Sequence, residues 1–213
     1  TPFTEKMNPF PVDPYAISKV ASEEVLKNLC ELNNIEYVIA VPHNIIGPRQ
    51  KYDDPFRNVV SIMINRMMQG KAPIIYGDGM QTRCFSFIQD VLSCLMTACL
   101  DDEPLGNVIN VGPDEEVITI NQLSEKICEL TNFKGVPKFL PARPQEVKHA
   151  VCSSKKARKI LDYGTKVNLE DGLKSMVQYI EKRGVSKFNR HIPVEIISDL
   201  TPKTWISDRM NQK

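Results

Sequence analysis

The chain has 213 residues and a formal net charge of +1, with 42% hydrophobic and 25% charged residues. This composition is close to the average of soluble globular proteins, and it indicates neither a nucleic-acid-binding protein nor one that binds anionic membranes. No apolar run approaches the roughly 20 residues that cross a bilayer, and residues 1–14 lack the apolar core of a signal peptide.

The first third of the chain predicts two helices and one strand. Residues 1–13 contain three prolines and no periodicity, which indicates a loop. Apolar residues at three- and four-residue steps predict a helix from Pro14 to Asn33-Asn34. The apolar run 35–42 predicts a strand buried on both faces of a parallel sheet. After a loop, residues 56–70 predict a second helix closed by Gly70.

The remaining elements are shorter and unevenly spaced. In chain order, we expect a strand at 73–79, a strand running into a helix at 85–100, a strand at 107–112, a helix at 119–132 capped by Thr119, a strand at 137–141, a short capped helix within 153–164, and an amphipathic helix at 168–184. The tail from Val185 has no clear period. Strands alternate with helices, which indicates an α/β fold. The strands expected after residue 50 are few and short, which is typical of the edge of a larger sheet together with a small α/β lobe.

The cysteines and histidines indicate neither disulfides nor a metal site. The six cysteines form no Cys-x-x-Cys pair and lie mostly among apolar neighbours, as buried free thiols do. The three histidines lack the spacing of metal ligands. A reducing cytoplasm is therefore the expected compartment.

The segment Pro14-Tyr15-Ala16-Ile17-Ser18-Lys19 is the sharpest chemical feature. Tyr15 and Lys19 are four residues apart on the predicted helix, so both side chains project from one face. An ammonium group beside a phenol stabilises phenolate, which makes Tyr15 a candidate general base for a hydroxyl proton. The same spacing also occurs by chance in surface pairs on ordinary helices, so the motif alone does not assign catalysis.

A series of motifs in a fixed order carries a family resemblance. The motifs are PFTE at residues 2–5, PYAISK at 14–19, HNIIGPRQ at 43–50, IIYGDGMQTRCFSFIQDV at 74–91, NVINVG at 107–112 and PARPQEVKHA at 141–150. From Pro2 to about Gly184 the chain resembles the extended short-chain dehydrogenases that act on nucleotide sugars, especially the UDP-glucose 4-epimerase-like group. The resemblance implies the C-terminal part of an extended Rossmann-type fold, with the last parallel strands and a small α/β substrate-binding lobe.

The resemblance also implies a domain plan, a cofactor and partners. Residues 1–45 would be a remnant of the NAD-binding domain, 46–184 the substrate-binding lobe with the closing strands, and 185–213 a tail of unknown role. The family's G-x-x-G-x-x-G turn, which places the dinucleotide pyrophosphate on a helix N-terminus, does not occur here. We therefore expect an incomplete fragment, with NAD bound mainly by an absent N-terminal half. The complete protein would be a homodimer that binds a UDP-sugar.

Carried over position by position, the resemblance implies a set of site residues. Tyr15 would be the catalytic base, with Lys19 stabilising its phenolate and hydrogen-bonding the nicotinamide ribose, and Pro42 would lie beside the nicotinamide. The implied substrate contacts are Asn44 and Asn58 at the diphosphate, Tyr76 on the base, Arg83 and Arg143 at the phosphates, Glu146 at the ribose hydroxyls and Ala150 at the sugar. Each also has a plain structural interpretation, as a loop or cap residue, a core aromatic or a surface ion pair.

The expected activity is reversible oxidation at the sugar C4, which makes the complete protein a nucleotide-sugar 4-epimerase. A 4,6-dehydratase or a decarboxylase shares the first oxidation, and a non-catalytic nucleotide-sugar-binding module is a further alternative. His43 and Cys84 depart from the family's usual aromatic residue and aspartate, which leaves the sugar open. A small residue at Ala150 leaves room for an N-acetyl group, so both UDP-hexoses and UDP-N-acetylhexosamines are expected substrates.

Overall fold

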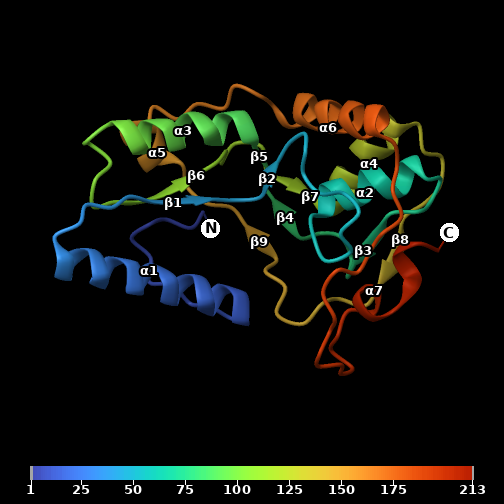
Figure 1. Cartoon of the computed structure of the whole chain (residues 1–213). Helices are drawn as coiled ribbons and strands as arrows, with labels where there is room; N and C mark the ends of the chain where they lie inside the picture. The colour runs from blue at the N-terminus through green and yellow to red at the C-terminus, as the bar shows by residue number, and fades with distance from the viewer. Residues whose placement is uncertain (1, 213) are drawn as a thin grey trace. The chain divides into compact units, whose positions relative to one another are not determined.

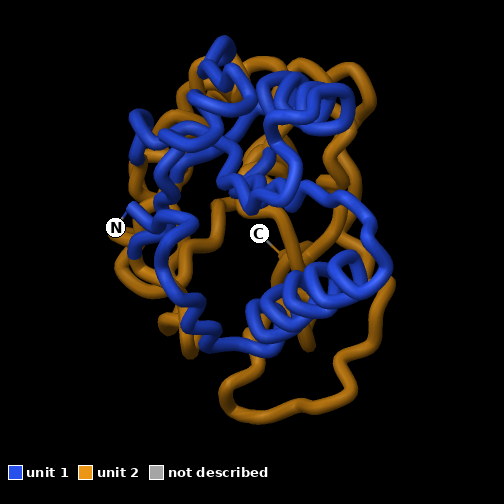
Figure 2. Tube along the Cα trace, turned by 90° about the vertical axis from the view of Figure 1, so that its left-hand side faces the viewer, with its two compact units in different colours: residues 1–45, 84–117, 149–167 blue, residues 46–83, 118–148, 168–213 orange. Residues whose placement is uncertain are grey.

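The computed structural model describes residues 2–212, and its chain divides into two compact units, shown in Figure 2. Unit 1 comprises Thr1–Ile45, Cys84–Val117 and His149–Val167, and unit 2 comprises Ile46–Arg83, Ile118–Lys148 and Asn168–Lys213. Each unit is therefore assembled from segments that are far apart in sequence. Thr1 and Lys213, which end the predicted ranges 1–45 and 185–213, lie outside the described residues.

Unit 1 is a small parallel sheet with helices. Its elements are α1 (Pro14–Asn33), β1 (Ile39–Pro42), β5 (Ser86–Phe87), α3 (Ile88–Leu100), β6 (Val108–Val111), β9 (His149–Ala150) and α5 (Lys155–Ile160), while β2 (Ile45–Ile46) spans the boundary between the units. β1 pairs in parallel with β6, so that Ile39 lies opposite Val108. In Figure 1, α1 lies on the side of this sheet opposite to α3 and α5.

The core of unit 1 lies between this sheet and the helices α3 and α5. It contains Val91, Cys94, Ile109, Val111, Ala157, Leu161 and Tyr163. The expected parallel pairing of the first strand is confirmed, but its expected burial on both faces is wrong. Only Ile39 in β1 is buried, and residues 40–42 are half-buried.

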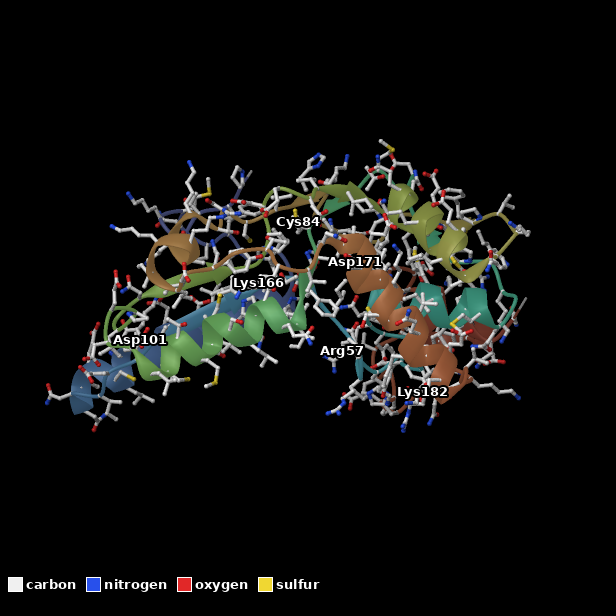
Figure 3. All side chains as sticks on the ribbon, turned by 90° about the horizontal axis from the view of Figure 1, so that it is seen from above. Arg57, Cys84, Asp101, Lys166, Asp171 and Lys182 are labelled. Carbon is white, nitrogen blue, oxygen red and sulfur yellow. The ribbon has the colours of Figure 1, made fainter. Side chains whose placement is uncertain are left out.

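Unit 2 is built around three packed helices (Figure 1). The helices are α2 (Val59–Met68), α4 (Ile120–Thr131) and α6 (Leu169–Arg183), and the strands are β3 (Ile74–Tyr76), β4 (Thr82–Arg83), β7 (Ile118–Thr119) and β8 (Lys138–Leu140). β3 pairs in parallel with β8, and β4 pairs antiparallel with β7. Asp171 and Lys182 lie near opposite ends of α6 in Figure 3, an arrangement that complements the helix dipole.

The expected helix boundaries follow local rules. Asn34 ends α1 in the left-handed conformation, with φ of 52°. Gly70 follows α2 with φ of 70°, and its N–H donates to the carbonyl of Met67 at 2.9 Å. Thr119 caps α4 in a reciprocal pair with Gln122. The short helix after residue 153 forms as α5, although the side chain of Ser154 makes no cap hydrogen bond there.

The tail, which we define as residues 185–212, is ordered. It contains α7 (Lys203–Ile206) and a 3-10 turn, η1 (Asp208–Met210). The guanidinium of Arg66, which is 1% exposed, donates from Nη1 to the carbonyl oxygens of Arg209 and Met210, and from Nη2 to that of Gln212 at 3.2 Å. Burial lowers the pKa of Arg66 to about 10, so the group stays cationic at neutral pH. Among the described residues, no helix is long and apolar enough to span a bilayer.

Candidate active site

Tyr15 and Lys19 lie on one face of α1 in unit 1. The ammonium nitrogen of Lys19 is 5.4 Å from the centre of the Tyr15 ring. Tyr15 is 70% exposed, so its hydroxyl is open to a ligand. The helix begins at Pro14 because Asp13 accepts a hydrogen bond from the N–H of Ala16 at 2.8 Å. This cap fixes the tyrosine in the first turn of the helix.

The residues after β1 form a tight loop in the same unit. Pro42 is the last residue of β1 and lies opposite Val111. Asn44 has a φ of 47°, and its side-chain amide donates to the carbonyl of Cys84 at 2.8 Å. Ala150, in β9, is half-buried. The carboxyl ends of parallel strands are where open α/β sheets bind ligands, and Pro42 stands at such an end.

One ring nitrogen of His43 is hydrogen-bonded, and the other has no hydrogen-bond partner among the described residues. Its Nε2 lies 3.1 Å from the carbonyl oxygen of Pro113, which can only accept, so this nitrogen carries a proton. Its Nδ1 is buried without a hydrogen-bond partner among the described residues. Burial lowers the pKa of His43, so the imidazole is neutral at pH 7. Only glycine fits at Gly112, since a Cβ there would lie 2.6 Å from His43 Cε1 and 2.3 Å from Ser86 Oγ.

Tyr76 and Arg143 stack in unit 2. The guanidinium carbon of Arg143 lies 4.1 Å from the centre of the Tyr76 ring. Tyr76 is 9% exposed, and its hydroxyl lies 2.7 Å from Oγ1 of Thr204. The Nε atom of Arg143 is buried and has no hydrogen-bond partner among the described residues. Such an orphaned cationic donor fits an anionic ligand.

A second guanidinium belongs to the same unit. Arg83 Nη2 lies 3.6 Å from Glu146 Oε1, and its Nη1 donates to the carbonyl of Thr82 at 2.8 Å. Burial lowers the pKa of Arg83, the negative charge of Glu146 opposes this shift, and the positive charge of Arg143 adds to it. Two guanidinium groups that repel each other are stabilised by a dianion such as a diphosphate.

A pocket of about 330 Å³ lies beside Tyr76 and Arg143. It is lined by residues 140–144, a segment that begins with the last residue of β8, and by residues 199–203 of the tail. Sequence reasoning missed the tail residues because the tail shows no period and no motif. The described residues contain no cluster of His, Cys, Asp and Glu suited to a metal ion.

The structure brings the predicted site residues together in pairs. Tyr15 contacts Lys19, Tyr76 stacks with Arg143, and Arg83 pairs with Glu146. Asn58 caps α2, accepting from the N–H of Val60 at 3.4 Å. Pro42, Asn44 and Ala150 belong to unit 1, whereas Asn58 belongs to unit 2. The functions predicted for these side chains stay predictions.

Residues 1–176 match the model of a family described as GDP-mannose 4,6 dehydratase. The chain is 33% identical over 174 residues to a putative UDP-glucose 4-epimerase of Methanocaldococcus jannaschii, an alignment that covers 80% of this chain and 54% of the relative. The chain thus spans about half the length of the curated relatives it matches.

Two solved structures are similar in fold. The UDP-glucose 4-epimerase of Thermotoga maritima, solved with UDP-glucose, superposes with a TM-score of 0.79 at 32% identity, covering 85% of this chain and 58% of that one. The UDP-glucuronic acid 4-epimerase of Bacillus cereus, in complex with UDP-glucuronic acid and NAD, gives a TM-score of 0.80 at 28% identity, covering 86% and 57%. The expected α/β fold of Rossmann type is thereby confirmed.

Proposed function

Because this chain belongs to the epimerase and dehydratase family of extended short-chain dehydrogenases, we propose that it is the base-bearing and substrate-binding part of a nucleotide-sugar 4-epimerase. The observation that carries the proposal is the pair of Tyr15 and Lys19 on an exposed face of α1. A module that only binds nucleotide sugars needs no base beside an ammonium group. An epimerase needs one for the C4 hydroxyl.

The reaction that we propose assigns proton transfer to Tyr15. Its phenolate accepts the proton of the C4 hydroxyl during oxidation and returns a proton to the C4 oxygen during reduction. The positive charge of Lys19 stabilises the phenolate. NAD, when bound, supplies the acceptor and then the donor of the hydride. The exposed faces of Tyr15 and Lys19, together with Pro42 at the carboxyl end of β1, suit a nicotinamide ribose in unit 1.

The substrate in this proposal is a UDP-hexose or a UDP-N-acetylhexosamine. Arg83 and Arg143 bind the diphosphate, which the unpartnered Nε of Arg143 supports. Glu146 forms an ion pair with Arg83 and accepts hydrogen bonds from the ribose hydroxyls. Tyr76 lies on the nucleobase side of the site, with Arg143 stacked on its ring. Ala150 leaves space for a substituent at the sugar C2. Asn44 and Asn58 contact the diphosphate and the neighbouring backbone.

A second candidate is a nucleotide-sugar 4,6-dehydratase or decarboxylase. The description of the matching family as a GDP-mannose 4,6 dehydratase favours the dehydratase. Both activities begin with the same oxidation at C4, and Tyr15 would have the same function. The products distinguish them, because only an epimerase returns a hexose of unchanged composition.

We also propose that the complete enzyme is a homodimer. Helix α1 carries exposed apolar side chains, including Val25 at 58% and Leu29 at 53% exposure. Covering these side chains in a second copy would remove apolar surface from water.

Native mass spectrometry tests the binding half of the proposal. The chain, near 24.1 kDa, should bind UDP-glucose, and Arg143→Met should weaken this binding by about 10- to 100-fold, because a charge-assisted bond is lost. Arg183→Met on the exposed end of α6 is the matched control. Retention of UDP-glucose by Arg143→Met, or no binding by the unmodified chain, would contradict the proposal. The same spectra report any dimer and any bound NAD.

A further inference from the structure

The tail lies beyond residue 176, where the family match ends, yet it is anchored firmly within unit 2. The buried guanidinium of Arg66 binds carbonyl oxygens at residues 209, 210 and 212. Within the tail itself, the side chain of Asn211 accepts from the N–H of Phe188 at 2.8 Å and donates to its carbonyl at 3.0 Å, which joins the two ends of the tail. Met210 is 4% exposed, and the Trp205 ring packs edge-on against Phe56, with centroids 5.6 Å apart. These contacts fix the tail in one position on unit 2.

The anchored tail faces the pocket that contains Tyr76 and Arg143. Residues 199–203 and residues 140–144 both line this pocket. The lining includes prolines and leucines together with two cations, Arg143 and Lys203, and one carboxylate, Asp199. Apolar side chains suit a nucleobase, and the two cations, which outnumber the one carboxylate, suit a phosphate. The chemistry of the pocket is therefore that of a nucleoside phosphate.

Thr204 connects the tail to the stacked pair. It is 3% exposed, and its hydroxyl is hydrogen-bonded to the buried hydroxyl of Tyr76 at 2.7 Å. Tyr76 in turn carries the guanidinium of Arg143 on its ring face. Loss of the threonine hydroxyl would leave the tyrosine hydroxyl unpartnered in a buried place. The ring, and the arginine stacked on it, would then lose their fixed position.

We propose that the tail is part of the nucleotide-binding site, with residues 199–203 as one wall of the pocket and Thr204 as the positioning residue for Tyr76 and Arg143. This inference rests on the proposed function, because it takes the nucleotide part of a UDP-sugar as the ligand. It assigns a function to a segment that the family match does not cover. Lys203 contacts the nucleotide directly, and Thr204 acts only through Tyr76.

Calorimetric titration with UDP, the probe ligand, tests the positioning by Thr204. Thr204→Val keeps the shape and removes the hydroxyl, and it should weaken UDP binding by about 3- to 10-fold. Thr204→Ser keeps the hydroxyl and should restore binding to within about 2-fold of the unmodified chain. Tyr76→Phe removes the other half of the bond, so combining it with Thr204→Val should cost little more than either change alone. If the losses of UDP affinity in Thr204→Val and Tyr76→Phe add up in the double variant, Thr204 does not position Tyr76. Weak UDP binding by Thr204→Ser would contradict the proposal in the same way.

A charge reversal tests the wall without risk to folding, because both lysines concerned are exposed. Lys203→Glu should weaken UDP binding by about 10-fold or more, since it places a carboxylate beside the phosphates. Lys187→Glu, in the same tail but outside the pocket, is the matched control and should stay within about 2-fold. Equal UDP affinities of Lys203→Glu and Lys187→Glu would contradict the proposal that residues 199–203 form a wall of the nucleotide pocket.

The single tryptophan separates failure of this inference from failure of the proposed function. Trp205, the only tryptophan in the chain, follows Thr204 directly, so its fluorescence should change as UDP fills the pocket. UDP binding that leaves Trp205 and all tail variants unaffected would overturn the tail's function while the proposed function stands. Absence of UDP binding by the unmodified chain would overturn both.

Discussion

The ammonium nitrogen of Lys19 lies 5.4 Å from the centre of the Tyr15 ring, one helical turn along α1. Both residues are in unit 1, on the helix that Asp13 caps. The helix therefore holds an ammonium group over the tyrosine ring on an exposed face. The proposed reaction depends on this pair.

Removing the phenolic hydroxyl should separate catalysis from binding. In NAD-containing protein, Tyr15→Phe should lower the conversion of UDP-glucose to its C4 epimer by about 100- to 10,000-fold, the usual range for a general base. Binding of UDP should stay within about 2-fold, because Tyr15 makes none of the proposed diphosphate contacts. Tyr179→Phe on α6 is the matched control. Full turnover by Tyr15→Phe would rule out this residue as the base.

The size of residue 150 should set the sugar specificity. Ala150 is half-buried in β9, and a tyrosine there would occupy the space that we assign to a substituent at C2. Ala150→Tyr should lower kcat/KM for a UDP-N-acetylhexosamine by about 10-fold or more relative to a UDP-hexose, since steric exclusion from a pocket is worth about 1–3 kcal/mol. Steady-state kinetics with both substrates measures the ratio. An unchanged ratio would show that residue 150 does not line the sugar site.

Asp114 should make the stability of unit 1 depend on acid pH. Burial alone would raise its pKa, but the N–H of Ser154 at 2.8 Å and the guanidinium of Arg158 at 2.9 Å outweigh burial and hold the pKa below its ordinary value. A carboxyl with a depressed folded-state pKa contributes stability above its unfolded pKa of about 4 and loses it as the pH falls through the folded value.

The corresponding test is urea unfolding of Asp114→Asn. The substitution should lower the free energy of unfolding at pH 7 by up to about 1 kcal/mol, because the pair is partly exposed and screened. The difference should shrink as the pH falls below the unfolded pKa of about 4 and then through the lower folded value, where the native carboxyl is also protonated. Asp102→Asn, an exposed change in the same unit, is the control. If the difference in the free energy of unfolding between Asp114→Asn and the unmodified chain does not change with pH, the ionisation of Asp114 contributes nothing to stability.

Sequence alone predicted the elements that obey local rules. Asn34, Gly70 and Thr119 end or begin helices where their own backbone and side-chain preferences place them. The second helix begins later than predicted because Asp54 accepts from the N–H of Phe56 at 2.8 Å, which holds residues 54–57 in a turn before Asn58 caps α2. The predicted strand 35–42 begins only at Ile39, since the N–H of Ile35 remains bonded to the carbonyl of Cys30 at the end of α1.

The part of the site that sequence missed depends on contacts between distant residues. The ring of Tyr76 was expected to pack on the base, yet one ring face supports Arg143 and the hydroxyl is hydrogen-bonded to Thr204, 128 residues further along the chain. A threonine in a tail without periodicity gives no pattern that could indicate such a partner. Glu146 likewise pairs with Arg83 across 63 positions.

Cysteine reactivity should follow burial. Burial raises the pKa of Cys84 to about 12 and that of Cys94 to about 11, and nearby carboxylates add to both shifts. At about pH 8 these thiols are almost entirely protonated, and the thiolate is the reactive form. Cys99 is exposed, whereas Cys84 lies within the fold (Figure 3). Iodoacetamide should therefore modify Cys99 at least about 100-fold faster than Cys84 in the native protein.

Peptide mass spectrometry after timed alkylation measures these rates, and the same reaction in urea supplies the control, because all six thiols should then react alike. Protection of Cys84 also reports on the loop that holds the candidate site, since the side-chain amide of Asn44 donates to the Cys84 carbonyl at 2.8 Å. Rapid native labelling of Cys84 would mean that this loop opens readily. The position that we propose for Asn44, beside a diphosphate, would then have to form on binding rather than before it.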